Sequence, residues 1–135
     1  MSELAAIEAN APAAVRGDTL LHFDIRADNL LLADDRVWIV DWPHAHVGAA
    51  WVDMVLFAPS VTMQGGPPPE QLSVHHPAIH DAKPDDVTAV IAAVAGFFIY
   101  HSLQPEPPGL PTLRAFQAAQ GAVALDWLAE RTAWR

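Results

Sequence analysis

Two short apolar runs on either side of a polar turn constrain this fold more than any other part of the sequence. Residues 30–32 are three leucines, and residues 37–40 read Val-Trp-Ile-Val, rich in β-branched and aromatic side chains. Between them, residues 33–36 read Ala-Asp-Asp-Arg, which is a turn signal. This pattern is typical of a β-hairpin with a tight polar turn. We therefore expect a two-stranded ribbon in this part of the chain.

The expected register brings two oxygen-bearing side chains together at the open end of the hairpin. With Asp34 and Asp35 at the centre of the turn, Asn29 lies opposite Val40, within one residue of Asp41. Directly opposed residues are ~5 Å apart and diagonal ones roughly 7–8 Å apart. Magnesium prefers oxygen and is usually held by one or two protein groups together with phosphates and water. Asn29 and Asp41 are therefore candidate magnesium ligands.

The loop before the hairpin contains a candidate acid–base group. Residues 22–29 read His-Phe-Asp-Ile-Arg-Ala-Asp-Asn, which gives the spacing HxDxxxxN from His22 to Asn29. Asp24 lies in this polar loop, where a carboxylate can accept a proton from an incoming hydroxyl. Taken alone, Asp24 is as readily explained as a turn residue as it is as a base. Arg26 alone is more often a surface ion-pair residue than a phosphate-binding one. The interpretation therefore depends on the whole pattern.

The segment over residues 20–42, with its Asp-Trp ending, resembles the aminoglycoside phosphotransferase and choline kinase family, which shares the protein-kinase-like fold. Those enzymes keep an HGD-type loop and an IDW-type strand end. The resemblance covers residues 22–53 firmly and the helical remainder only in general pattern. It implies transfer of the γ-phosphate of ATP or GTP to a hydroxyl of a small molecule, with Mg²⁺ as cofactor.

The resemblance also assigns a role to each residue of the motif. Asp24 would be the catalytic base, Asn29 and Asp41 the magnesium ligands, and His22 a brace for the loop. Arg26 follows the base by two residues, where protein kinases place a Lys near the transferred phosphate. Asp53 resembles the acidic residue that supports the loop from a following helix.

The sequence departs from the family pattern in three ways. Phe23 stands where the family usually has Gly or Arg, and Pro43 where many members have Gly or Glu. The family's nucleotide-covering loop and its ATP-binding Lys lie upstream of the catalytic loop, but here only residues 1–21 precede His22, and the sole Lys is Lys83. We therefore expect the C-terminal catalytic lobe without the N-terminal nucleotide-binding lobe, inactive as an isolated fragment.

The remaining pattern predicts an α+β fold with helix in excess, as one domain over residues 1–135. The catalytic loop and metal-binding hairpin span residues 19–42, and the helical part spans residues 49–135. Helices are expected over residues 2–9, from about 49 to 57, from Asp85 or Asp86 to 100, and after Thr112, with a strand over 19–23. Loops are expected over residues 63–69, 75–84 and 105–111, and the five tryptophans are expected mainly in the core.

Composition and charge limit the classes of partner and environment that suit this chain. The formal net charge of −9 argues against nucleic acid, whose binders need clustered Lys and Arg, and permits a cationic acceptor. The absence of cysteine excludes disulfides and fits a cytoplasmic protein. The longest apolar stretch, residues 87–100, is shorter than the ~20 residues that span a bilayer and predicts a buried helix instead.

Two other functions remain open from the sequence. The same lobe can be a non-catalytic remnant or interaction module of the kinase-like fold. Less favoured is a metal-dependent hydrolase that uses His22, Asp24 and a downstream His. The remaining histidines, His44, His46, His75, His76 and His80, lack a ligand carboxylate at fixed spacing, which disfavours a zinc site. His44 and His46 are instead expected to line the mouth of the site. A lobe separated from its neighbour exposes apolar surface, so self-association is expected as well.

Overall fold

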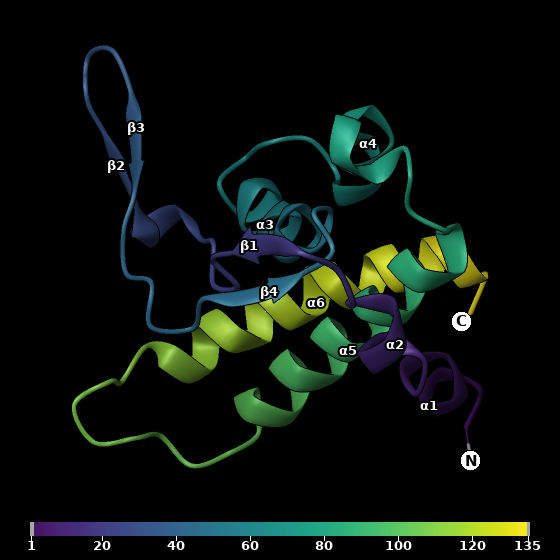
Figure 1. Ribbon diagram of the computed structural model, residues 1–135. Helices are drawn as coiled ribbons and strands as arrows, with labels where there is room; N and C mark the ends of the chain where they lie inside the picture. Colours follow the sequence, from purple (N-terminus) through teal and green to yellow (C-terminus); the bar gives the residue numbers. More distant parts are fainter. Residues whose placement is uncertain (1, 135) are drawn as a thin grey trace.

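The computed structural model describes residues 2–134 and has an α+β architecture of helices and two small antiparallel sheets (Figure 1). The elements in chain order are α1 (Glu3–Glu8), α2 (Ala11–Ala14), β1 (Thr19–Leu21), η1 (Ala27–Asn29), β2 (Leu30–Leu32), β3 (Val37–Ile39), β4 (His46–Gly48), α3 (Val52–Met63), α4 (Pro69–His75), η2 (Pro77–Ile79), α5 (Pro84–Ser102) and α6 (Leu113–Thr132). The expected α+β class, with helix in excess, is confirmed.

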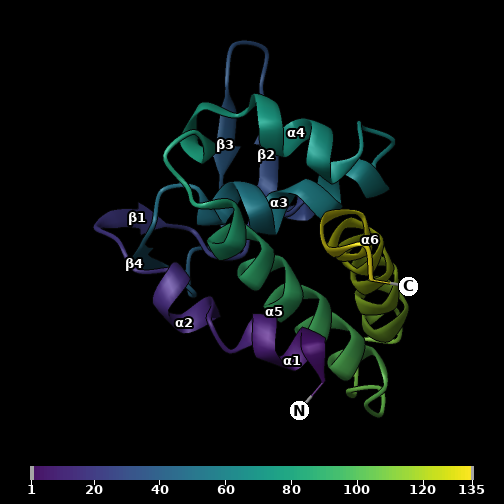
Figure 2. The ribbon, with the colours of Figure 1, turned by 90° about the vertical axis from the view of Figure 1, so that its right-hand side faces the viewer.

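The two longest helices, α5 and α6, lie side by side and form the centre of the helical body (Figure 1). Pro84 occupies the first turn of α5, where its missing N–H costs nothing, and Asp85 and Asp86 complement the positive end of the helix dipole. Gly121 of α6 lets the helices approach closely, because a Cβ there would lie 2.8 Å from Cδ1 of Ile99. The short helices α1 and α2 lie along the side of α5 away from α6 (Figure 2).

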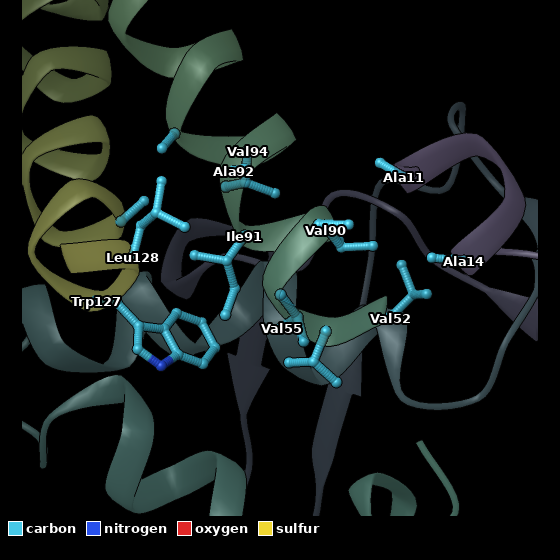
Figure 3. Close-up of a cluster of buried hydrophobic side chains, with 14 of the residues drawn as sticks. Ala11, Ala14, Val52, Val55, Val90, Ile91, Ala92, Val94, Trp127 and Leu128 are labelled. Atoms are coloured by element: carbon cyan, nitrogen blue, oxygen red, sulfur yellow. The ribbon is translucent and has the colours of Figure 1, made fainter. Parts of the chain in front are cut away.

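One apolar core joins α3, α5 and α6 (Figure 3). Val55 of α3, Ile91 of α5 and Trp127 of α6 are almost completely buried there. The indole N–H of Trp127 donates to the carboxylate of Glu70 at 2.5 Å, so this buried donor has a partner. Arg131 also binds Glu70, at 2.8 Å, which ties α4 to α6.

The β2–β3 hairpin forms in the register expected from the sequence. Its paired residues are Leu30↔Ile39, Leu31↔Trp38 and Leu32↔Val37. The Val40 N–H donates to the Asn29 carbonyl at 3.0 Å, so these two residues are opposed as predicted. The hairpin projects away from the helical body (Figure 1). The ladder therefore brings the residues that begin and end it to one place.

A second antiparallel pair, β1–β4, was not predicted. Its paired residues are Thr19↔Gly48, Leu20↔Val47 and Leu21↔His46. The strand β4 reads His-Val-Gly and closely follows Pro43 and His44, so the composition of this segment does not indicate a strand. The pairing is set instead by tertiary contact, since Leu21 is buried and a Cβ on Gly48 would lie 2.8 Å from its side chain.

Several other expectations about helices need correction. Helix α3 begins and ends later than predicted, and continues through Pro59, a residue that usually interrupts a helix. The 3₁₀ turn η2 lies entirely within residues 75–84, expected to be a loop, and α4 overlaps the two expected loops at its first and last residues. Helix α5 is not buried along its whole length, because Phe97 is 54% exposed and Tyr100 62% exposed.

The tryptophans divide into two groups. Trp51 and Trp127 are buried, as expected, but Trp38, Trp42 and Trp134 are exposed, so their assignment to the core was wrong. Trp38 belongs to a two-stranded ribbon that projects from the helical body (Figure 1), so strand pairing alone does not bury it. Among residues 2–134, no helix has the length and apolar character required to cross a membrane.

Candidate functional site

The loop after β1 is held in place by a carboxylate from α3. The backbone N–H groups of His22 and Phe23 donate to the two oxygens of Asp53, at 2.7 and 2.9 Å. Hydrogen bonds to a charged acceptor are among the stronger ones in proteins. Asp53, expected to support the loop, thus contacts it across about thirty residues of sequence. This contact connects the loop to the helical body.

His22 is buried, and both of its ring nitrogens are engaged. Nε2 lies 2.8 Å from the Val40 carbonyl, so it carries the proton and donates to that oxygen. Nδ1 then accepts the backbone N–H of Asp24 at 3.2 Å. The indole of Trp42 meets the imidazole edge-on, with the ring centroids 4.7 Å apart. His22 therefore joins the loop to the end of β3, and neither nitrogen is left to ligate a metal.

Asn29 lies against Asp24 at the base of the hairpin. Its Nδ2 donates to the Asp24 carbonyl at 2.8 Å and lies 3.4 Å from the Asp24 carboxylate. This orientation commits the amide nitrogen to the loop and leaves the Oδ1 oxygen as the group that can bind a cation. The side chain is buried, at 4% exposure, so its rotamer is fixed by the surrounding structure.

Two residues of the site have left-handed backbone conformation. Phe23 has φ of 69° and Asp41 has φ of 63°, and only one other non-glycine residue within residues 2–134 has positive φ. Asp tolerates this region because its short polar side chain can bond locally, whereas an aromatic residue is strained there. Such strain concentrates at functional sites. The structure therefore places a strained residue directly before Asp24 in the loop.

Asp41 is exposed and directly follows Val40, which pairs with Asn29. The register places Val40 opposite Asn29, and the proximity of Asp41 to Asn29 stays a prediction. Both supply hard oxygens, the donor type that magnesium takes. The residues present are chemically suited to hold this ion.

Arg26 is directed at the carboxylates of its own loop. Its Nε lies 3.5 Å from Asp24 and 3.2 Å from Asp28, and its guanidinium lies 5.3 Å from the ring centre of Phe116 in α6. The Nε atom is buried without a well-aligned hydrogen bond, so the two ion pairs are electrostatic contacts. In this arrangement Arg26 neutralises part of the charge that Asp24 and Asp28 accumulate.

Three contacts to the loop were not anticipated. The buried hydroxyl of Ser60 accepts the Ala27 N–H at 3.1 Å, Phe116 lies beneath Arg26, and Trp42 packs on His22. Ser60 and Phe116 come from helices whose packing on the loop is a long-range property, and no local pattern marks them. Trp42 belongs to the Asp-Trp ending of the motif, but nothing in the sequence indicates that it packs on His22.

The other histidines do not form a metal centre in the part of the chain that the structure describes. Among residues 2–134, no three side chains of His, Asp or Glu lie close enough together to hold an ion. His46 and His75 each bond a nearby backbone carbonyl instead, those of His44 and Gln71. The hydrolase alternative, which would use His22, Asp24 and a downstream His, stays a prediction.

We compared the chain with known protein families, curated proteins and solved structures. No protein-family model, no curated protein and no solved structure matches the chain.

Proposed function

We propose that this chain carries the catalytic loop of a phosphotransferase that moves the γ-phosphate of ATP or GTP to a hydroxyl of a small molecule. One observation supports this most directly. The Asn29 amide is bonded to the Asp24 backbone and lies beside its carboxylate, at the base of a ribbon whose second strand leads into Asp41. Phosphoryl transfer requires mainly positioning and charge neutralisation, and this grouping supplies both.

In this proposal Asp24 accepts the proton of the acceptor hydroxyl. Its backbone is held on both sides, by the His22 ring and by the Asn29 amide, while its side chain remains 29% exposed. A base needs this combination of fixed direction and access to a hydroxyl. Arg26 acts as a positioning residue, because its ion pair limits the directions in which the Asp24 carboxylate can turn.

Asn29 and Asp41 would hold Mg²⁺, which when bound neutralises negative charge on the phosphates. The Asn29 orientation favours this role, because the amide nitrogen faces Asp24 and the oxygen remains free. Asp53 and His22 act as supporting residues that would not touch the substrate. They fix the loop and the end of β3 relative to one another.

The metal half of the proposal is tested by Mn²⁺ binding, followed by electron paramagnetic resonance of the purified chain. Asp41→Ala, at an exposed position, should abolish or strongly weaken binding while the circular dichroism spectrum stays unchanged. Asp34→Ala is the matched control, since Asp34 is an exposed carboxylate at the other end of the same hairpin. Equal Mn²⁺ affinity in both variants would refute the assignment.

The catalytic half is tested by transfer of label from γ-labelled ATP or GTP, with Mg²⁺, to a panel of alcohols. The assay includes an N-terminal nucleotide-binding lobe of a phosphotransferase, because the chain alone is expected to be inactive. Asp24→Asn keeps the shape of the side chain and removes the base, so transfer should fall by roughly 10²–10⁴-fold. Mn²⁺ affinity should change far less. Transfer that persists at the original rate in Asp24→Asn would exclude Asp24 as the base. An original chain that binds Mn²⁺ but transfers nothing, even with the nucleotide-binding lobe supplied, would favour the non-catalytic module.

A further inference from the structure

A large open groove runs beside the candidate catalytic loop. Its volume is about 820 Å³, within the range of roughly 300–1,000 Å³ that is usual for small-molecule sites. One wall is the face of α5 that carries Val94, Phe97 and Phe98, and the other is formed by α1 and α2. Figure 2 shows these two short helices lying along α5. Phe23 and Asp24 of the loop close part of it.

The lining is mainly apolar, and its few polar side chains are unevenly placed. Asp24 comes from the loop after β1. His46 comes from β4, and its ring lies 5.1 Å from that of Phe23. Glu8 comes from α1, where its carboxylate would lie 3.8 Å from a Cβ built on Gly96 of α5. The groove thus has one carboxylate at the catalytic loop and a second on a different element.

An apolar wall selects against a heavily hydroxylated ligand. Burying a hydroxyl without a hydrogen-bond partner is unfavourable, and α5 offers the groove only hydrocarbon side chains along this face. Phe97 is 54% exposed, so an apolar ligand would remove ring surface from water. The second carboxylate adds attraction for a positive charge in an otherwise uncharged wall.

We propose that this groove binds the phosphate acceptor, and that the acceptor is an apolar alcohol carrying an amine. The inference rests on the proposed phosphotransferase function. The apolar body lies along α5, the hydroxyl reaches Asp24, and the amine is attracted by Glu8. Transfer forms a bond from the alcohol oxygen to the γ-phosphorus and breaks the γ-phosphorus bond to the bridging oxygen. The nucleoside diphosphate leaves with that oxygen, and Asp24 receives the hydroxyl proton.

Calorimetric titration of the whole chain with decanol, aminodecanol and the polycationic amino sugar kanamycin tests the ligand class. Aminodecanol should bind most tightly, decanol next, and kanamycin weakest. Phe97→Ser should weaken aminodecanol binding about tenfold, because part of the buried ring surface is lost. Tyr100→Ser is the matched control, since Tyr100 is an exposed aromatic residue of the same helix outside the groove. It should leave the affinity unchanged.

The role of Glu8 is tested separately. Glu8→Gln should remove a preference of about two- to fivefold for aminodecanol over decanol, the size expected for an exposed charge pair. Glu3→Gln, on the same helix but outside the lining, should preserve that preference. Both substitutions are at exposed positions, so they should leave the fold intact.

The results separate this inference from the proposed function. Tightest binding by kanamycin, no binding by either alcohol, or equal effects of Phe97→Ser and Tyr100→Ser would overturn the groove assignment, even with Asp24 and Asp41 acting as proposed. If the alcohols bind as expected but Asp24→Asn transfers phosphate normally, the phosphotransferase proposal fails, and with it the groove's role as an acceptor site.

Discussion

The two small sheets differ sharply in how the rest of the molecule contacts them. Each is a pair of three-residue antiparallel strands. The β1–β4 pair buries Leu21 and Gly48 against the body, whereas every residue of β3 and two of the three in β2 are exposed. The more apolar ribbon is the more exposed one. Composition therefore predicted the strands of the hairpin correctly, but not whether those strands would be buried.

This difference explains how the candidate site is supported. A lone two-stranded ribbon is marginally stable in water, so β2–β3 needs attachment at its open end. Three contacts provide it: the His22 ring bonds Val40, the Asn29 amide bonds Asp24, and Ser60 accepts from Ala27. Asp53 in turn fixes the loop that contains His22. The hairpin thus depends on the loop, and the loop depends on β1 and α3.

The largest expected effect compares one leucine from each sheet. Leu21 is 2% exposed and Leu31 is 55% exposed, so the same truncation to Ala removes buried contacts in one case only. Leu21→Ala should lower the free energy of unfolding by about 3 kcal/mol, and Leu31→Ala by less than about 0.5 kcal/mol. Urea denaturation followed by circular dichroism measures both. Equal losses would show that the hairpin is buried against something in solution.

The next effect concerns the anchor of the loop. Asp53→Ala leaves the N–H groups of His22 and Phe23 without their acceptors and should cost about 2 kcal/mol. Asp53→Asn keeps a single acceptor oxygen and should retain part of the stability. Amide hydrogen exchange should quicken at His22 and Phe23 before it does in α5. An unchanged exchange rate at these two amides would contradict the assigned support.

Much of the site follows from sequence because it depends on local rules. Turn chemistry at Asp34 and Asp35 set the register, and the register placed Asn29 opposite Val40. By contrast, β4, the late end of α3 and the groove depend on how distant segments pack. Pro59 indicates a helix end by local rules, yet α3 continues through it and brings Ser60 to the loop. Tertiary contacts of this kind have no signature in a single chain.

A smaller effect tests the strain in the loop. At most positions Gly is less stable than Ala by roughly 0.5–1 kcal/mol, but at the positive φ of Phe23 the order should reverse. Phe23→Gly should therefore be more stable than Phe23→Ala by about 1 kcal/mol, although both lose the ring contact with His46. Thermal unfolding of the two variants gives the comparison. If Ala is the more stable, the left-handed conformation is absent in solution.

The smallest effect compares two carboxylates that each accept two hydrogen bonds. Asp53 binds backbone groups distant in sequence, whereas Asp35, at the tip of the hairpin, binds the guanidinium of the adjacent Arg36 at 3.0 and 2.6 Å. The Arg36 hydrogen bonds lower the pKa of Asp35, so any stability from this pair is present above the unfolded-state pKa and is lost as pH falls through the folded value.

That contribution should be undetectable, because both side chains of the pair are exposed and adjacent residues can pair in the unfolded chain as well. Asp35→Asn should leave the urea midpoint unchanged at neutral pH and at pH values below the ordinary carboxyl pKa. An NMR titration of the original chain should still give a lowered pKa for Asp35. A midpoint shift as large as that of Asp53→Ala would mean that the hairpin tip is held by the fold, and the distinction between the two sheets would fail.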